Sequence, residues 1–126
     1  MSFLNNNTFL MTEKVLDFLW QKQSVSSTNL ANVETPGYKA KYVTFEDELR
    51  NRINSSTNKN SKDIRNSLEQ LKATVNYTNN ESTRADGNNV NADAESVEVA
   101  KTALQYNFMI KSFSDDITKF RTIIKG

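Results

Sequence analysis

The chain contains neither cysteine nor histidine among its 126 residues. This absence excludes disulfides, a thiol nucleophile, a Cys/His zinc site and any catalytic pair built on histidine. The sequence has only 3 glycines and 1 proline, which argues against a sandwich of many short strands and favours long helices. No apolar run exceeds a few residues and none follows the start, so we expect neither a membrane-spanning helix nor a cleavable secretory signal.

The charges nearly cancel, with 16 Lys and Arg against 15 Asp and Glu. This balance excludes nucleic-acid binding through a broad basic surface. The basic residues Lys39, Lys41, Arg50 and Arg52 lie near aromatic residues, but acidic residues are interspersed among them, so we expect no nucleic-acid site there. The apolar fraction of 37% is low for a globular domain, and the length fits one unit without a large central core.

The last third of the chain carries the strongest helical pattern. Its seam residues recur in alternating steps of four and three, as on one face of a coiled-coil helix: Val99, Ala103, Tyr106, Ile110, Phe113, Ile117, Phe120 and Ile124. Asn91 is placed to cap the start of this helix and Gly126 to cap its end. The pattern predicts a helix over 92–125.

The first third of the chain predicts a second long helix over 8–33. Its seam is apolar toward both ends, at Leu16, Leu19 and Leu30, and polar in the middle, at Gln23 and Ser26. Two helices of this length, about 40 to 50 Å each, do not fit inside a 126-residue globule about 36 Å across. The fold class we predict is therefore mainly α, with an elongated, coiled-coil-like pair of terminal helices.

Apolar residues beside the C-terminal seam need a further partner. One helix covers one stripe, which leaves Leu104, Phe108, Met109 and Ile123 for a second contact. The sequence thus indicates a subunit whose remaining apolar surface is buried by other chains.

The middle of the chain, 34–91, is predicted to hold short elements and loops. Thr35-Pro36-Gly37-Tyr38 predicts a type II turn with a positive φ at Gly37. A short extended segment at 42–44 leads into a helix that Thr44 would cap and that carries Phe45 and Leu49 one turn apart.

A polar stretch follows this short helix. Residues 54–63 contain no apolar side chain, so we expect a mobile polar loop there. The stripe Ile64, Leu68, Leu71 and Val75 favours a marginal third helix, and 79–91 is loop-like with a turn at Asp86-Gly87.

Two acidic segments fail as chemical sites. Asp86 to Glu95 resembles a calcium loop, but Val90, Asn91 and Val97 occupy the positions that an EF-hand gives to a ligand, glycine and glutamate. Glu46, Asp47 and Glu48 follow one another around a short helix, as on a solvated face. We therefore expect no catalytic, metal or cofactor site.

Two motifs are more specific. The chain resembles the bacterial flagellar axial proteins, whose A-N-x-x-T-x-G-Y type signature closes their first helix, and it is most similar to the proximal-rod family of the basal body. The residues that carry this resemblance lie in two segments: Asn29, Ala31, Asn32, Thr35, Pro36, Gly37 and Tyr38, and then Asp86, Gly87, Asn88 and Asn89.

The resemblance implies a structural rod subunit without enzymatic activity that helps transmit torque from the motor to the hook and filament. It implies contacts with copies of itself, other rod proteins, the basal adaptor and the export-gate and MS-ring proteins, with no cofactor, nucleic acid or small-molecule substrate. It further implies a place in the rod, in the periplasmic space, reached through the flagellar type III apparatus without a cleavable signal. Phe45 and Leu49 resemble an export-gate pattern, although packing on the subunit's own helices explains their spacing equally well. A small helical adaptor or secretion chaperone remains the alternative.

Overall fold

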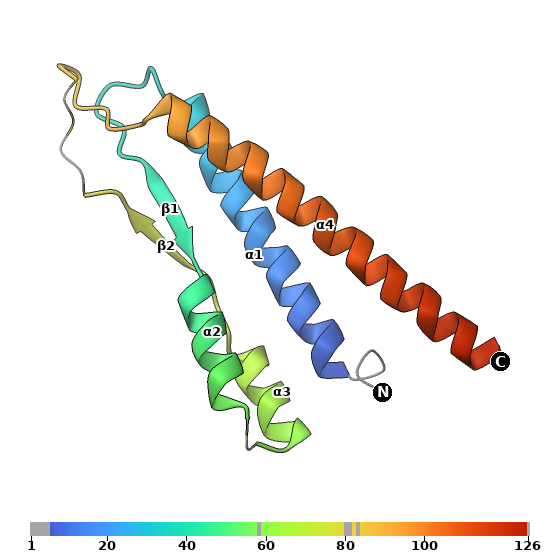
Figure 1. Cartoon of the computed structure of the whole chain (residues 1–126). Coiled ribbons are helices and arrows are strands. Elements are labelled where there is room, and N and C mark those ends of the chain that lie inside the picture. Colours follow the sequence, from blue (N-terminus) through green and yellow to red (C-terminus); the bar gives the residue numbers. More distant parts are fainter. Residues whose placement is uncertain (1–5, 58, 80–81, 83, 126) are drawn as a thin grey trace.

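The computed structural model describes residues 6–57, 59–79, 82 and 84–125. Two long helices are formed by the two ends of the chain, and the middle segment, with two short helices and two short strands, lies beside them (Figure 1). In chain order the elements are α1 (Asn6–Ala31), β1 (Lys41–Thr44), α2 (Glu46–Ser55), α3 (Ser61–Glu69), β2 (Thr74–Tyr77) and α4 (Ala92–Lys125). The prediction of a mainly α fold with a short, partly β middle segment is confirmed.

Helices α1 and α4 lie side by side and antiparallel (Figure 1). Near one end the rings of Phe9 and Phe113 meet edge to face with centroids 5.6 Å apart, and farther along Trp20 lies 6.3 Å from Tyr106. With 26 and 34 residues, the helices are about 39 and 51 Å long. The predicted elongated pair is therefore present, with α1 beginning and ending two residues earlier than the sequence pattern suggested.

The contact face of α4 differs from the predicted seam at two positions. Ile110 and Ile124 are 41% and 67% exposed, whereas Thr102, which the pattern did not include, is fully buried. A straight helix turns by about 20° per heptad relative to a strict seven-residue repeat, so the residues that face α1 drift off the seam. Met109, predicted to need an outside partner, packs against the chain's own core.

The middle segment forms an arm along α1 (Figure 1). Strands β1 and β2 pair antiparallel, with Lys41 opposite Tyr77 and Thr44 opposite Thr74. The core lies where this arm meets α1, and the Phe18 and Phe45 rings pack with centroids 4.8 Å apart. Its buried members are Phe18, Leu19, Val43, Phe45 and Leu71.

Several local predictions for the arm need correction. Thr44 does not cap α2: it ends β1, Phe45 takes the cap position, and no side chain there accepts a capping hydrogen bond. The polar stretch is shorter than predicted, because α2 extends to Ser55 and α3 begins at Ser61, where the Oδ1 atom of Asn60 accepts from the Asp63 N–H at 2.9 Å. Val75 lies in β2 and not on a helical stripe.

The cap of α4 is confirmed, since the Oδ1 atom of Asn91 accepts from the Ala94 N–H at 3.1 Å. Gly126, predicted to cap the other end, lies outside the described residues. Within the described part of the chain, no helix has the length and hydropathy that crossing a membrane requires.

Candidate functional site

The two motif segments singled out in the sequence meet at one end of the helix pair. The Gly37 N–H donates to the Asp86 carbonyl at 2.7 Å, and the Asn89 N–H donates to the Tyr38 carbonyl at 3.2 Å. Both glycines have positive φ, +73° at Gly37 and +78° at Gly87, and a Cβ on Gly87 would lie 3.7 Å from the Gly37 Cα atom. The close approach of these two backbones defines a motif cluster, formed by residues 29–41 and 84–90.

The turn in the first segment is the one that the sequence predicts. The Tyr38 N–H donates to the Thr35 carbonyl at 3.2 Å, which closes a four-residue turn with Gly37 at its third position. A positive φ at that position is what a type II turn requires. The turn directs the chain from the end of α1 back along the helix into β1.

Asn88 joins this turn to the segment before α4. Its side chain is only 1% exposed, and its Nδ2 atom donates to the carbonyls of Asn32 at 2.8 Å and Thr35 at 2.9 Å. Its Oδ1 atom accepts from the Val90 N–H at 2.8 Å. One buried amide thus pairs with three backbone groups that would otherwise lose their hydrogen bonds to water.

Asn29 makes the corresponding link on the inner side of the cluster. It is fully buried, and its amide pairs with both backbone groups of Lys41, accepting from the N–H at 3.0 Å and donating to the carbonyl at 2.7 Å. The Tyr38 hydroxyl donates to the Asn29 Oδ1 atom at 3.1 Å, and the Asn29 Nδ2 atom donates to Glu95 at 3.0 Å. Asn29 therefore connects α1, β1 and the first turn of α4.

The other asparagines of the motifs complete these connections. The Asn89 Oδ1 atom accepts from the Ala40 N–H at 2.6 Å, and its Nδ2 atom donates to the Thr78 carbonyl at 3.1 Å. Asn32 donates to the Thr28 carbonyl at 2.8 Å within its own helix end. Of the remaining motif residues, Ala31 and Pro36 are exposed, so their side chains stay at the surface of the cluster.

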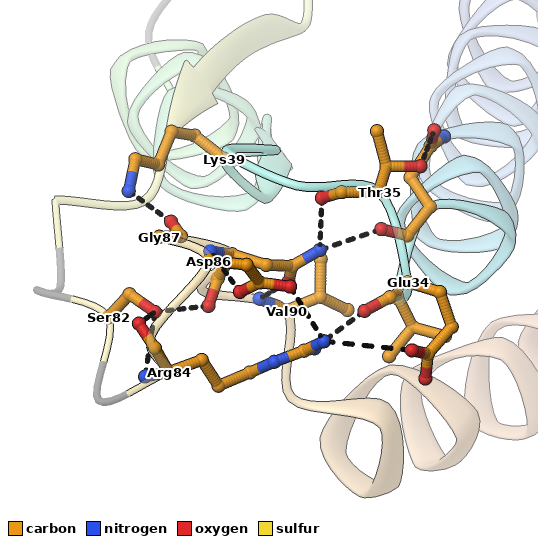
Figure 2. Close-up of polar contacts among 11 residues, drawn as sticks. Glu34, Thr35, Lys39, Ser82, Arg84, Asp86, Gly87 and Val90 are labelled. Atoms are coloured by element: carbon orange, nitrogen blue, oxygen red, sulfur yellow. Dashed lines mark hydrogen bonds and ion pairs between the residues drawn. The ribbon is translucent and has the colours of Figure 1, made fainter.

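Arg84 also belongs to the cluster, although the sequence analysis did not single it out. Its guanidinium donates to the Val33 carbonyl at 2.5 Å and pairs with Asp86 at 3.1 Å, with Glu34 at 3.9 Å (Figure 2). Lys39 donates to the Gly87 carbonyl on the opposite side of the same loop (Figure 2). The contacts of Arg84 with Val33 and of Lys39 with Gly87 join residues about 50 positions apart, so no local pattern could have revealed them.

Next to the cluster, charged residues connect α1 with α4 and with the arm. The Lys22 ammonium lies 2.6 Å from Glu46 on α2 and 3.3 Å from Glu98 on α4. Burial alone would lower the pKa of Lys22, but the hydrogen bond and charge of Glu46 and the charge of Glu98 outweigh it, so this pKa is raised. Burial would raise the pKa of Glu46, but the hydrogen bond and charge of Lys22 and the backbone hydrogen bonds from Glu46 and Phe45 together outweigh this effect, so this pKa is lowered.

Glu95 behaves differently from Glu46. Burial raises its pKa, the hydrogen bonds from Asn29 and Ser26 oppose this rise without cancelling it, and the nearby charge of Glu98 adds to it. The carboxylate of Glu95 is therefore held in an environment that favours its protonated form.

The outer face of α4 presents an apolar stripe, which we define as Val97, Leu104 and Phe108. These side chains are 66%, 72% and 70% exposed. Ile123, also predicted to need a partner, is 45% exposed. Large apolar side chains aligned on one exposed helix face are typical of a surface that another chain covers.

The elongated helix pair, the loop cluster that closes one end of it and the uncovered apolar stripe define a class of protein: a structural subunit that completes its packing in an assembly. No family model matches the chain. It is 29% identical to the flagellar basal body rod protein FlgB of Buchnera aphidicola over 134 residues, which cover 96% of both chains. It is 29% identical to FlgB of Bacillus subtilis over 109 residues, covering 83% of both chains, and 26% identical to FlgB of Escherichia coli over 124 residues, covering 90% of both.

Over most of its length the chain is similar, at 23–29% identity, to FlgB flagellar basal body rod proteins of diverse bacteria. This similarity indicates a structural subunit of the flagellar basal body rod. The alternative of a small helical adaptor or secretion chaperone is not supported.

Proposed function

We propose that the whole chain, 1–126, works as one rod subunit and that its apolar stripe packs against neighbouring subunits, both copies of itself and other rod proteins. The exposure of Val97, Leu104 and Phe108 carries this proposal. Burying three such side chains contributes on the order of 5 kcal/mol, enough to favour ordered contacts between subunits.

The motif cluster supports this role by fixing the arm relative to the helix pair. Asn29 and Asn88 together bond backbone groups of α1, the turn, β1 and the segment before α4. A subunit that passes torque from the motor to the hook and filament must not flex where its segments join. Buried, fully paired amides at that junction provide this stiffness.

The test replaces the stripe without disturbing the fold. We expect Leu104→Glu with Phe108→Glu to leave the stability of the isolated subunit unchanged within about 0.5 kcal/mol, since both side chains are exposed. The variant should abolish swimming and leave no rods in purified basal bodies.

The matched control is Asn107→Glu with Ser114→Glu, which changes two exposed polar residues of the same helix about a quarter turn away from the stripe. This control should assemble normally if the effect depends on the apolar stripe. Normal rods in the Leu104/Phe108 variant would show that the subunits bind one another through a different surface.

We further propose that the basal neighbours of the subunit are the adaptor and the MS-ring and export-gate proteins, that it lies in the periplasmic part of the rod and that it has no catalytic activity. The resemblance in the two motifs supports the neighbours and the location. The absence of cysteine and histidine supports the lack of catalytic activity. Export would proceed through the flagellar type III apparatus.

Phe45 and Leu49 bear on this export route. Phe45 is 5% exposed and packs in the core, and Leu49 packs against the same core. The folded subunit therefore buries Phe45 and partly buries Leu49, and we propose that an export gate recognises the pair only in the unfolded chain.

A further inference from the structure

The interface between α1 and α4 contains a polar layer near the end of α1 and the start of α4. On one side of this layer Phe9 packs on Phe113 and Trp20 on Tyr106. Several members are almost completely buried, with 5% exposure at Ser26 and none at Asn29 and Thr102. The layer comprises Lys22, Gln23, Ser26 and Asn29 on α1, and Glu95, Glu98 and Thr102 on α4.

The layer does not increase the stability of the pair as apolar residues would. Among the described residues, the Gln23 Oε1, Glu98 Oε1 and Thr102 Oγ1 atoms are buried and have no hydrogen-bond partner, although Glu98 Oε1 lies 3.3 Å from the Lys22 ammonium as an ion pair. Buried polar atoms without a partner destabilise a fold, and well-packed apolar residues in their place are often neutral or stabilising. The layer therefore needs an explanation other than stability.

The contacts across the layer hold in one alignment of the helices only. Lys22 lies 3.3 Å from Glu98, and Asn29 lies 3.0 Å from Glu95. A shift of α4 by seven residues in one direction keeps the apolar repeat matched and brings Phe120 opposite Phe9. The same shift puts Gln105 opposite Lys22, so Lys22 loses its carboxylate on α4. Glu98 then comes opposite Asn29, and Glu95 moves beyond the end of α1 and loses its partner.

The opposite shift is also unfavourable. It brings Glu95 opposite Lys22, but it takes Asn29 beyond the start of α4 and places Glu98 opposite Val15, so one carboxylate would face an apolar side chain inside the pair. A buried charge without a partner is strongly destabilising. The apolar repeat alone does not distinguish these registers, because it looks the same after every seven residues.

We propose that the polar layer fixes the register in which α1 pairs with α4. The Lys22–Glu98 and Asn29–Glu95 contacts select this alignment. The unpaired atoms of Gln23 and Thr102 lower the stability of the helix pair, and this loss accompanies the selection. The proposal concerns pairing within one chain and stands independently of the rod assignment.

Engineered disulfides report the register directly, because the chain has no cysteine of its own. Phe9→Cys with Phe113→Cys joins positions that face each other in the observed register. Phe9→Cys with Phe120→Cys joins positions displaced by about 10 Å along the helix, which is too far for a disulfide unless α4 shifts by one heptad.

Each pair is oxidised in the full chain with the native layer and in a variant with Lys22→Met, Glu95→Leu and Glu98→Leu. With the native layer we expect the 9–113 disulfide to exceed the 9–120 disulfide by more than about tenfold. In the apolar variant the two yields should fall within about threefold of each other. An apolar variant that still forms only the 9–113 disulfide would overturn the proposal.

A charge-reversed variant keeps the test informative if the apolar variant does not fold. Lys22→Glu, Glu46→Lys and Glu98→Lys together retain the pairing with opposite signs, so this variant should keep the native preference for 9–113. Glu98→Leu alone, with one partner removed, should increase the 9–120 disulfide at least threefold over the native layer. Failure of either expectation would contradict a register role, and helical circular dichroism confirms that each variant is folded.

Discussion

Replacing Asn88 tests whether the motif cluster depends on hydrogen bonds or only on shape. Aspartate has nearly the shape of asparagine, but at neutral pH it cannot donate. Asn88→Asp keeps the bond accepted from the Val90 N–H and loses both donated bonds, to the Asn32 and Thr35 carbonyls at 2.8 and 2.9 Å. It also places a negative charge against those two carbonyl oxygens.

The expected magnitude follows from these contacts. A typical hydrogen bond contributes about 1 kcal/mol net, and a buried group left without a partner costs about 1–3 kcal/mol. Asn88→Ala loses three bonds at a site that is 1% exposed, so the free energy of unfolding should fall by about 3 kcal/mol. Asn88→Asp should cost at least as much at neutral pH, because repulsion from the two carbonyls replaces the third lost bond.

The assay is urea denaturation of the isolated subunit followed by helical circular dichroism, with the unfolding free energy extrapolated to water. The penalty of Asn88→Asp should shrink as the pH falls from neutral toward about 4, because the buried carboxyl beside two carbonyl oxygens is protonated above the ordinary aspartate pKa and can again donate one bond. Asn79→Asp is the matched control, since Asn79 is exposed and the same substitution there should cost less than about 0.5 kcal/mol. An Asn88→Asp variant as stable as the wild type at neutral pH would refute the view that these bonds hold the cluster together.

Three further substitutions probe other parts of the molecule. Gly37→Val should lower the free energy of unfolding by on the order of 1–3 kcal/mol through backbone strain alone, since φ is +73° and no atom lies within 4 Å of the added Cβ. Purified basal bodies should lack rods although the protein is still exported. Normal rods with normal swimming would show that the turn is merely tolerated. Because burial raises the pKa of Glu95, the folded state binds its proton more tightly than the unfolded chain, so the wild type should lose stability relative to Glu95→Gln as the pH rises from about 4 to about 7. Denaturation across that range measures the difference, and two parallel stability curves would contradict this cause. Phe45→Ala with Leu49→Ala should reduce secretion without changing the cytoplasmic level, whereas Leu71→Ala, which disrupts the same core outside the pattern, should not; normal secretion by the double variant would leave these residues a packing role only.

The features that the sequence predicted well are those determined by neighbouring residues. The seven-residue repeat of 99–124 predicts α4, because a helix places such residues on one face whatever surrounds it. The turn at Gly37 and the Asn91 cap likewise depend on only a few adjacent residues. Local chemistry is sufficient in these cases.

The features that the sequence did not predict depend on distant partners. The strand β2 carries no clear alternation, and its pairing with β1 joins residues more than 30 positions apart, such as Lys41 and Tyr77. Arg84 lies in a polar loop, where the neighbouring residues do not restrict the residue type. Its contact with the Val33 carbonyl becomes visible only in the folded chain. The two motifs indicated the residues of the cluster, but only the folded structure shows that the Asn88 side chain, in the second segment, bonds to backbone carbonyls of the first.

The narrow junction at Gly37 and Gly87 has a practical consequence for how the protein can be altered. The arm leaves and rejoins the helix pair where the Gly37 N–H donates to the Asp86 carbonyl, so the ends of this long excursion are already tied together. Added length at its tip then enlarges a closed loop, and each doubling of a flexible loop costs only about 0.6 kcal/mol. An epitope or fluorescent label inserted between Lys59 and Asn60, two exposed residues, would mark the subunit inside the rod while the helix pair and its apolar stripe stay as they are.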